Sequence, residues 1–251
     1  MATILISGAS AGFGEHTARR LVELGHKVIA VARRADRLEE LRGELGGNLY
    51  ALPVDLADKS AISSSLAALP AEFSEVDILI NNAGLALGVA KAQEAKLADW
   101  DAMIDVNIRG LVYLTHAVLP GMVARDRGHV INLGSVAADN PYPGGNVYGS
   151  TKAFVRQFSR NLRADLHGSQ VRVTTIQPGL SAGTEFTTVR LYGDADKAAE
   201  RYQGVAALQP SDIAESIVWA ISRPPHVNIN EIEIMPVSQS WAALPIHRTA
   251  L

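Results

Sequence analysis

The stretch TILISGASAGFG, residues Thr3–Gly14, decides the fold of this 251-residue chain. Thr3–Ser7 is a short apolar run rich in β-branched residues, which predicts a buried strand. Gly8, Gly12 and Gly14 then allow a tight turn and a close approach of the following helix to that strand. The first turn of such a helix presents free N–H groups and the positive end of its dipole, which together bind phosphate. The stretch therefore predicts a strand–turn–helix unit that holds the pyrophosphate of a dinucleotide.

Strand-like and helix-like segments alternate along the rest of the chain. Further strands are predicted at Lys27–Ala32, Leu49–Val54, Val76–Asn81, His129–Gly134, Val171–Ile176 and Ile229–Met235, and helices notably at Ala98–Ala124, Asn146–His167 and Pro210–Ser222. This alternation is typical of an α/β protein with a parallel sheet covered by helices on both faces. We expect one domain over residues 1–251, a Rossmann fold with a doubly wound parallel sheet of about seven strands. The least regular stretch, Leu180–Gln209, follows the sixth strand and is predicted to be a substrate lid, with a surface insertion as the alternative.

Composition excludes several classes of protein. The formal net charge is −3, so no basic footprint for nucleic acid or for a membrane surface is expected. The chain has no cysteine, which excludes disulfides and a cysteine nucleophile. No leader precedes the first strand and no apolar run reaches the roughly 18–20 residues of a membrane span, so a soluble cytoplasmic protein is expected. The seven histidines show no paired ligand spacing, and no metal site is expected.

The end of the second strand indicates which nicotinamide dinucleotide would bind. NAD-binding chains usually place an acidic residue there, which accepts hydrogen bonds from the ribose hydroxyls. Here Ala32 is followed by Arg33 and Arg34. An acid would repel a 2′-phosphate, whereas an arginine fork binds it through charge-assisted hydrogen bonds. The sequence therefore favours NADP, with a merely solvated strand end as the alternative.

Ser135, Tyr148 and Lys152 form the candidate chemical site. Tyr148 and Lys152 are four residues apart on a predicted helix, so both side chains project from the same face. A free phenol has a pKa near 10, and we expect the Lys152 ammonium to lower the pKa of Tyr148. Ser135, at the end of the fifth strand, is placed to hydrogen-bond a substrate oxygen. The trio predicts an alcohol–carbonyl oxidoreductase in which Tyr148 moves the proton and Ser135 and Tyr148 contact the substrate.

These landmarks, in this order, resemble the short-chain dehydrogenase/reductase family from end to end. The matching positions are Gly8–Gly14, Asn81–Gly84, Asn107, Ser135, Tyr148, Lys152 and Pro178-Gly179. The resemblance implies catalytic roles for Asn107, Ser135, Tyr148 and Lys152, with Asn107 connecting the lysine to solvent through a water. It also implies adenine contacts from Asp55 and Leu56, and a homotetramer paired through the two long helices. The full set of expected cofactor contacts is Gly8, Ser10, Ala11, Gly12, Phe13, Gly14, Arg33, Arg34, Asp55, Leu56, Asn82, Ala83, Gly84, Tyr148, Lys152, Pro178, Gly179, Thr184 and Phe186.

Within that family the chain is similar to the NADP-dependent 3-hydroxy acid dehydrogenases, also described as serine or allo-threonine dehydrogenases. The residues that carry this similarity include Pro141–Asn146, Gly183–Phe186 and Met235–Val237. The similarity implies hydride transfer to or from small 3-hydroxy acids such as serine or 3-hydroxypropionate. An acidic substrate needs a cation, and the candidates are Arg190, Arg201 and Arg248, the last beside His247 in the tail.

Three alternatives stay open at this stage. The first is an NADPH-dependent reductase of aldehydes or ketones without a carboxylate, including sulfonated aldehydes. The second is a dehalogenase on the same fold, which Lys152 and the cofactor glycines argue against. The third is a dinucleotide-sensing regulatory protein, which would be expected to lose Tyr148 or Lys152.

Overall fold

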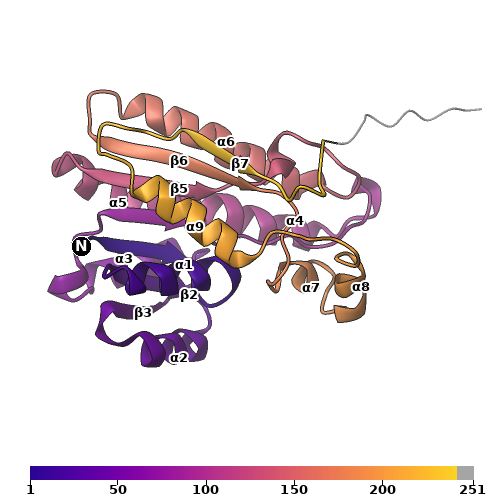
Figure 1. The fold of residues 1–251 in the computed structure, drawn as a ribbon, viewed down its shortest axis with the longest axis horizontal. Helices are drawn as coiled ribbons and strands as arrows, with labels where there is room; N and C mark the ends of the chain where they lie inside the picture. The colour runs from indigo at the N-terminus through magenta and orange to yellow at the C-terminus, as the bar shows by residue number, and fades with distance from the viewer. Residues whose placement is uncertain (242–251) are drawn as a thin grey trace, which may run out of the picture.

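The computed structural model describes residues 1–241 and contains a seven-stranded parallel sheet flanked by helices (Figure 1). The strands are β1 (Thr3–Ser7), β2 (Lys27–Ala32), β3 (Leu49–Pro53), β4 (Ile78–Asn81), β5 (Gly128–Leu133), β6 (Val171–Pro178) and β7 (Glu231–Ile234). The helices are α1 (Gly12–Glu23), α2 (Ala35–Leu45), α3 (Lys59–Ala67), α4 (Leu97–Ile104), α5 (Leu111–Ala124), α6 (Asn146–Asp165), α7 (Phe186–Arg190), α8 (Ala195–Glu200) and α9 (Pro210–Ile221).

The strand order is β3-β2-β1-β4-β5-β6-β7, and each neighbouring pair is parallel. The chain runs outward from β1 in one direction and outward from β4 in the other. This reversal leaves a crevice at the carboxyl ends of β1 and β4, which is where open α/β sheets bind ligands. The predicted doubly wound Rossmann fold is confirmed.

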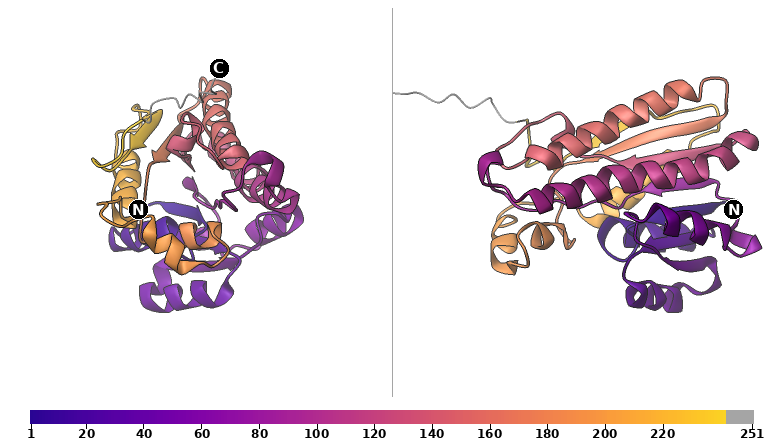
Figure 2. Two further views of the ribbon diagram at one scale, coloured as in Figure 1. Left: turned by 90° about the vertical axis from the view of Figure 1, so that its right-hand side faces the viewer. Right: turned by 180° about the vertical axis from the view of Figure 1, so that it is seen from behind.

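Successive side chains of the central strands point to opposite faces of the sheet and divide the core into two layers. Ile4 and Ile6 of β1 pack in a cluster with residues of α1, α2 and α9, whereas Leu5, between them, packs in a cluster with residues of α3, α5 and α6. Figure 2 shows α5 and α6 crossing the sheet on the face opposite α9. Because both faces are covered, the central strands β1, β2 and β4 are mostly apolar runs, with β1 buried at all five residues.

Element boundaries differ from the predicted ones by a few residues. Strand β6 runs two residues further than predicted, to Pro178, because it pairs with β7 as far as Ile234. The helix predicted over Ala98–Ala124 is interrupted by a π-helical segment, Asp105–Gly110. An apolar periodicity does not reveal this segment, since one wide turn leaves the buried stripe nearly unchanged.

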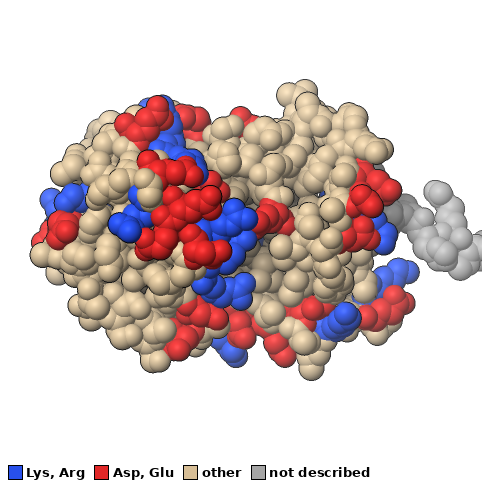
Figure 3. Space-filling view, turned by 90° about the horizontal axis from the view of Figure 1, so that it is seen from below, with Lys and Arg blue, Asp and Glu red and all other residues tan. Residues whose placement is uncertain are grey.

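The segment predicted to be a lid contains the short helices α7 and α8, which stand beyond the carboxyl ends of the strands (Figure 1). Within residues 1–241, no helix is both long and apolar enough to cross a membrane. On the face drawn in Figure 3, acidic and basic side chains are interspersed.

Candidate active site

A cavity of about 720 Å³ opens at the carboxyl edge of the sheet. Its wall comes from the segments that follow β1 to β6 and from the predicted lid, so the topology brings distant motifs together. Of the predicted site residues, those in the wall are Gly8, Ser10, Ala11, Gly12, Phe13, Arg33, Arg34, Asp55, Leu56, Asn82, Ala83, Gly84, Ser135, Tyr148, Lys152, Pro178, Gly179, Thr184 and Phe186. Gly14 and Asn107 are not part of the wall, and both lie behind it.

Local geometry explains why Gly8, Gly12 and Gly14 of the first turn are glycines. Gly8 and Gly12 have φ of 70° and 57°, in the left-handed region that other residues avoid. A Cβ on Gly14 would lie 2.3 Å from the carbonyl oxygen of Gly8, so α1 can approach the turn only without a side chain there. A Cβ on Gly12 would lie 3.1 Å from Cγ2 of Thr184 and would narrow the cavity. The turn therefore lacks side chains at its three glycine positions and lies at a helix N-terminus, which fits a pyrophosphate.

Two cations stand at the end of β2, as the sequence predicts. The Arg34 guanidinium donates to Oγ of Ser10 at 3.0 Å and forms an ion pair with Glu185 at 2.9 Å. Arg33 is exposed and lines the same cavity. No acidic side chain occupies the strand end itself, and the only acid that contacts Arg34 in the described chain comes from the lid. This end of the cavity fits a phosphate monoester.

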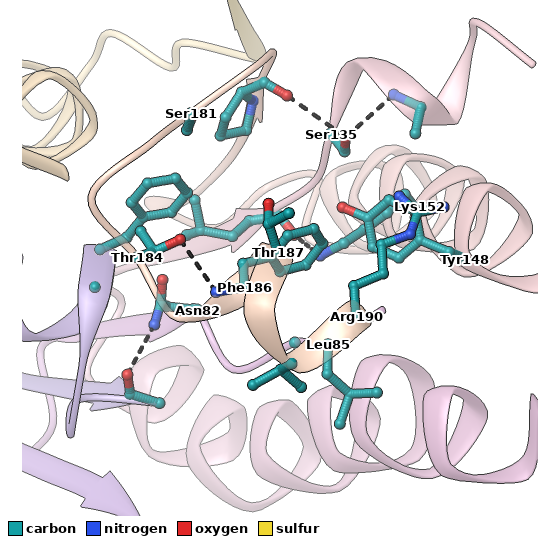
Figure 4. A pocket seen from close by; sticks show the side chains of 18 of the residues that line it. Asn82, Leu85, Ser135, Tyr148, Lys152, Ser181, Thr184, Phe186, Thr187 and Arg190 are labelled. Atoms are coloured by element: carbon teal, nitrogen blue, oxygen red, sulfur yellow. Dashed lines mark hydrogen bonds between the residues drawn. The ribbon is translucent and has the colours of Figure 1, made fainter. Parts of the chain in front are cut away.

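Tyr148 and Ser135 lie together in the inner part of the cavity (Figure 4). Ser135 caps a short 3₁₀ turn, and its Oγ accepts a hydrogen bond from the backbone N–H of Ala137 at 3.1 Å. The Tyr148 ring packs edge-on against Phe186 of α7, with the ring centroids 5.6 Å apart. Helix α7 thus helps to bury Tyr148, which is only 8% exposed.

The expected lowering of the Tyr148 pKa by Lys152 is wrong for the protein alone. Burial raises the pKa of Tyr148 to about 12, and the neighbouring Ser135 hydroxyl and Arg190 guanidinium offset this only in part. Nζ of Lys152 donates to the carbonyl oxygen of Leu133 at 2.7 Å and lies 5.9 Å from the centre of the Tyr148 ring. Burial also lowers the pKa of Lys152 to about 8. The sequence spacing places the pair on one helix face, but burial is the largest influence on the pKa of each group.

Asn107 lies in the π-helical segment and is fully buried. Its amide exchanges hydrogen bonds with the backbone N–H and C=O of Leu85, both at 2.9 Å, and donates to Oγ1 of Thr151 at 3.0 Å. A π-helical turn displaces one side chain relative to a regular helix, and such turns recur at functional sites. Here the displaced amide clamps the chain after β4 against α6, one residue before Lys152.

Arg190, at the end of α7, is the candidate cation that the structure brings beside Tyr148 (Figure 4). Its guanidinium carbon lies 5.7 Å from the centre of the Tyr148 ring and 5.3 Å from that of Tyr142. Arg201 also lines the cavity but is exposed, and Arg248 and His247 lie outside the described residues. Sequence reasoning missed Tyr142, although the turn that contains it, Pro141–Asn146, carries part of the family resemblance.

No cluster of three or more potential metal ligands occurs in the part of the chain that the structure describes. The polar groups that line the cavity include a phenol, a hydroxyl and several cations, beside a turn that fits phosphate.

The doubly wound sheet and the residues of the cavity together indicate one class of protein, and comparison with known proteins indicates the same class. The sequence model of the family described as short chain dehydrogenase matches residues 2–191, about three quarters of the chain. This chain belongs to the short-chain dehydrogenase/reductase family of oxidoreductases.

The relatives found are similar over almost their whole length. An NADP-dependent 3-hydroxy acid dehydrogenase of Escherichia coli K12 is 58% identical over 98% of this chain and 99% of its own. A serine 3-dehydrogenase of Agrobacterium fabrum is 52% identical over 98% of each chain. Among solved structures, the closed form of a serine dehydrogenase complexed with NADP+ superposes with a TM-score of 0.97, at 58% identity over 98% of this chain and 99% of that chain.

Proposed function

We propose that this chain is an NADP-dependent oxidoreductase that interconverts an alcohol and a carbonyl group, acting on small 3-hydroxy acids such as serine or 3-hydroxypropionate. The observation that carries the proposal is that Ser135, Tyr148 and Lys152 line one cavity with the glycine turn. The names of the relatives, which specify NADP, 3-hydroxy acids and serine, support the coenzyme and the substrate class.

The chain's own residues fit NADP at three places. The turn Gly8–Gly14 would hold the pyrophosphate, Ser10 with Arg33 and Arg34 would hold the 2′-phosphate, and Lys152 would hold the ribose next to the nicotinamide. A Cβ on Gly84 would lie 3.2 Å from Nζ of Lys152, so the missing side chain leaves room for ribose hydroxyls beside the ammonium. When bound, NADP supplies the hydride acceptor or donor.

The protein supplies the proton. With a pKa of about 12, the Tyr148 phenol is protonated at neutral pH and is ready to donate to a carbonyl oxygen during reduction. Oxidation requires Tyr148 to lose its proton first, so that its phenolate can accept the alcohol proton, and a neighbouring positive charge favours that phenolate. Ser135 would hydrogen-bond the same substrate oxygen and fix its direction.

The direct test is to incubate the protein with NADP+ and with 3-hydroxypropionate, serine or a short neutral alcohol, and to measure the NADPH formed by its absorbance. We expect activity with the 3-hydroxy acids. Tyr148→Phe should abolish turnover because it removes the transferable proton, while NADPH binding, measured by fluorescence titration, should be retained. Turnover near the wild-type rate in Tyr148→Phe would contradict the proposed role.

Two other functions remain to be tested in the same screen. A reductase of neutral or sulfonated aldehydes would reduce those carbonyls with NADPH but would not oxidise 3-hydroxy acids. A dinucleotide-sensing protein would bind NADPH without turning over any member of the panel. The retention of Tyr148 and Lys152 in the cavity favours catalysis over sensing.

We also propose a cytoplasmic homotetramer paired through α4–α5 and α6. Phe154 on α6 is 36% exposed and stacks on Phe158, with the ring centroids 5.8 Å apart. An apolar face of this kind on a long helix suits a subunit contact. Sedimentation velocity tests the assembly state.

A further inference from the structure

We propose that the Arg190 guanidinium and the Tyr142 hydroxyl form the subsite that binds the carboxylate of the substrate. This inference rests on the proposed oxidoreductase function and adds the residue that selects acidic substrates. Both groups line the cavity, and Nη1 of Arg190 donates to the Tyr142 hydroxyl at 2.9 Å.

The first argument is charge. Arg190 is only 6% exposed, yet no carboxylate among residues 1–241 pairs with it, and its hydrogen-bond partners are all neutral oxygens. Buried charges in proteins are normally paired, because removing an ion from water is costly. By contrast, Arg156, also partly buried, pairs with two carboxylates. An unpaired buried cation in a cavity wall therefore indicates that the missing anion is the ligand.

The second argument is hydrogen-bonding capacity. A guanidinium has five N–H donors. Arg190 uses three of them, on the carbonyl oxygens of Gly88 and Gly144 and on the Tyr142 hydroxyl. These contacts fix the guanidinium between two loops and leave two N–H groups for a carboxylate. The Tyr142 hydroxyl accepts from Arg190, so its own hydrogen is available as a further donor.

The third argument is distance from the reacting group. In a 3-hydroxy acid, two carbon–carbon bonds separate the hydroxyl carbon from the carboxylate carbon, a span of about 2.5 Å. The carboxylate must therefore lie close to the Tyr148 phenol. The Arg190 guanidinium carbon is 5.7 Å from the centre of that ring, whereas Arg34 is held at Ser10, beside the glycine turn.

The other cations of the cavity are placed for other tasks. Lys152 donates to the carbonyl oxygen of Leu133. Arg201 is exposed, so its charge is satisfied by water and gains less from a substrate anion. Arg190 is the buried cation on the substrate side of Tyr148 in the described chain.

The test compares two alcohols that differ in one group, 3-hydroxypropionate and 1,3-propanediol, with NADP+ as the coenzyme. Arg190→Gln should lower kcat/KM for 3-hydroxypropionate by about 10- to 100-fold, mostly through KM, because a charge-assisted contact to the substrate is lost. The kcat/KM for 1,3-propanediol should fall by a clearly smaller factor, because this alcohol has no carboxylate and loses only the effects of Arg190 on Tyr148 and on the two loops. Arg190→Lys should recover part of the loss, and Tyr142→Phe should show a smaller loss of the same selectivity.

Two results would overturn the subsite. One is an equal loss on both alcohols in Arg190→Gln, which would make Arg190 a structural clamp for the two loops. The other is an acid-selective loss in Arg201→Gln and none in Arg190→Gln, which would assign the carboxylate to Arg201.

A binding measurement without coenzyme gives an independent answer and covers the case in which Arg190→Gln folds poorly. Malonate should raise the unfolding temperature of the wild-type protein and of Arg190→Lys more than malonamide does. Equal shifts with malonate and malonamide would refute the anion subsite. If malonate stabilises the wild-type protein more than malonamide does, this difference shrinks in Tyr142→Phe, and neither alcohol is oxidised, the proposed reaction fails while the subsite stands.

Discussion

The ion pair between Arg34 and Glu185 predicts that one substitution in the cavity should strengthen the binding of NADPH. Arg34 is the arginine expected to bind the 2′-phosphate of NADP, yet a carboxylate from the lid already contacts it at 2.9 Å. An arriving phosphate has to compete with that carboxylate. Removing the charge by Glu185→Gln should therefore strengthen NADPH binding rather than weaken it.

The size of the effect follows from the exposure of the pair. The two side chains are 42% and 52% exposed, and ion pairs at such positions contribute about 0.2–1 kcal/mol. Release of Arg34 should lower the Kd for NADPH by a factor of about 1.4 to 5. NADH lacks the 2′-phosphate, so its Kd should stay unchanged. The difference should shrink at high salt, because screening weakens exposed charge interactions.

Fluorescence titration of NADPH and NADH against wild-type protein and Glu185→Gln measures both constants. Glu44→Gln is a matched control, since Glu44 is 49% exposed and pairs with Arg19 away from the cavity. It should alter neither constant. Weaker NADPH binding in Glu185→Gln, or the same change for NADH, would refute competition between the lid carboxylate and the phosphate.

Two further predictions concern the supports of the site. Gly14→Ala places a Cβ 2.3 Å from the carbonyl oxygen of Gly8, so it should lower the free energy of unfolding, measured in urea, by about 1–3 kcal/mol and should weaken NADPH binding. The control is Gly43→Ala in α2, where nothing lies within 4 Å of the added Cβ, and this change should not destabilise the protein. Burial, with the nearby Arg172 charge as a smaller cause, lowers the pKa of His129 from 6.5 to about 3. In the unfolded chain His129 therefore becomes protonated below about pH 6.5, whereas in the folded chain it stays neutral down to about pH 3. Acid thus favours the unfolded chain, and the free energy of unfolding should fall by about 2 kcal/mol between pH 7.5 and pH 5. In His129→Gln this part of the pH dependence should vanish, and an unchanged pH dependence would contradict it.

The sequence predicted what depends on local patterns. The glycine turn, the alternating elements and the spacing of Tyr148 and Lys152 each follow from neighbouring residues, and the topology then brings their strand ends together. It could not predict contacts that join distant segments. The carbonyl oxygen that Arg190 contacts belongs to Gly88, 102 residues earlier. The π-helical turn at Asn107 was likewise hidden, and the Asn107 amide it contains bonds Leu85, 22 residues earlier.

The pKa of Tyr148 was missed for a related reason. Spacing shows which groups are neighbours, but the direction of a pKa shift depends on how much water the fold removes, and α7 covers this phenol.

The positions of the positively charged side chains in the cavity indicate which part of it each ligand occupies. Arg33 and Arg34 stand at the end beside the glycine turn, Lys152 is buried, and Arg190, at the end of α7, lies beside Tyr148. A dinucleotide carries its charge on phosphates, so Coulomb attraction and the glycine turn both draw the phosphates to the end beside Arg33 and Arg34. The part of the cavity beside Tyr148 and Arg190 then remains for a small molecule whose own anion meets Arg190. A neutral alcohol of equal size would fill the same space but leave the charge of Arg190 unpaired, and that difference is what selects an acid.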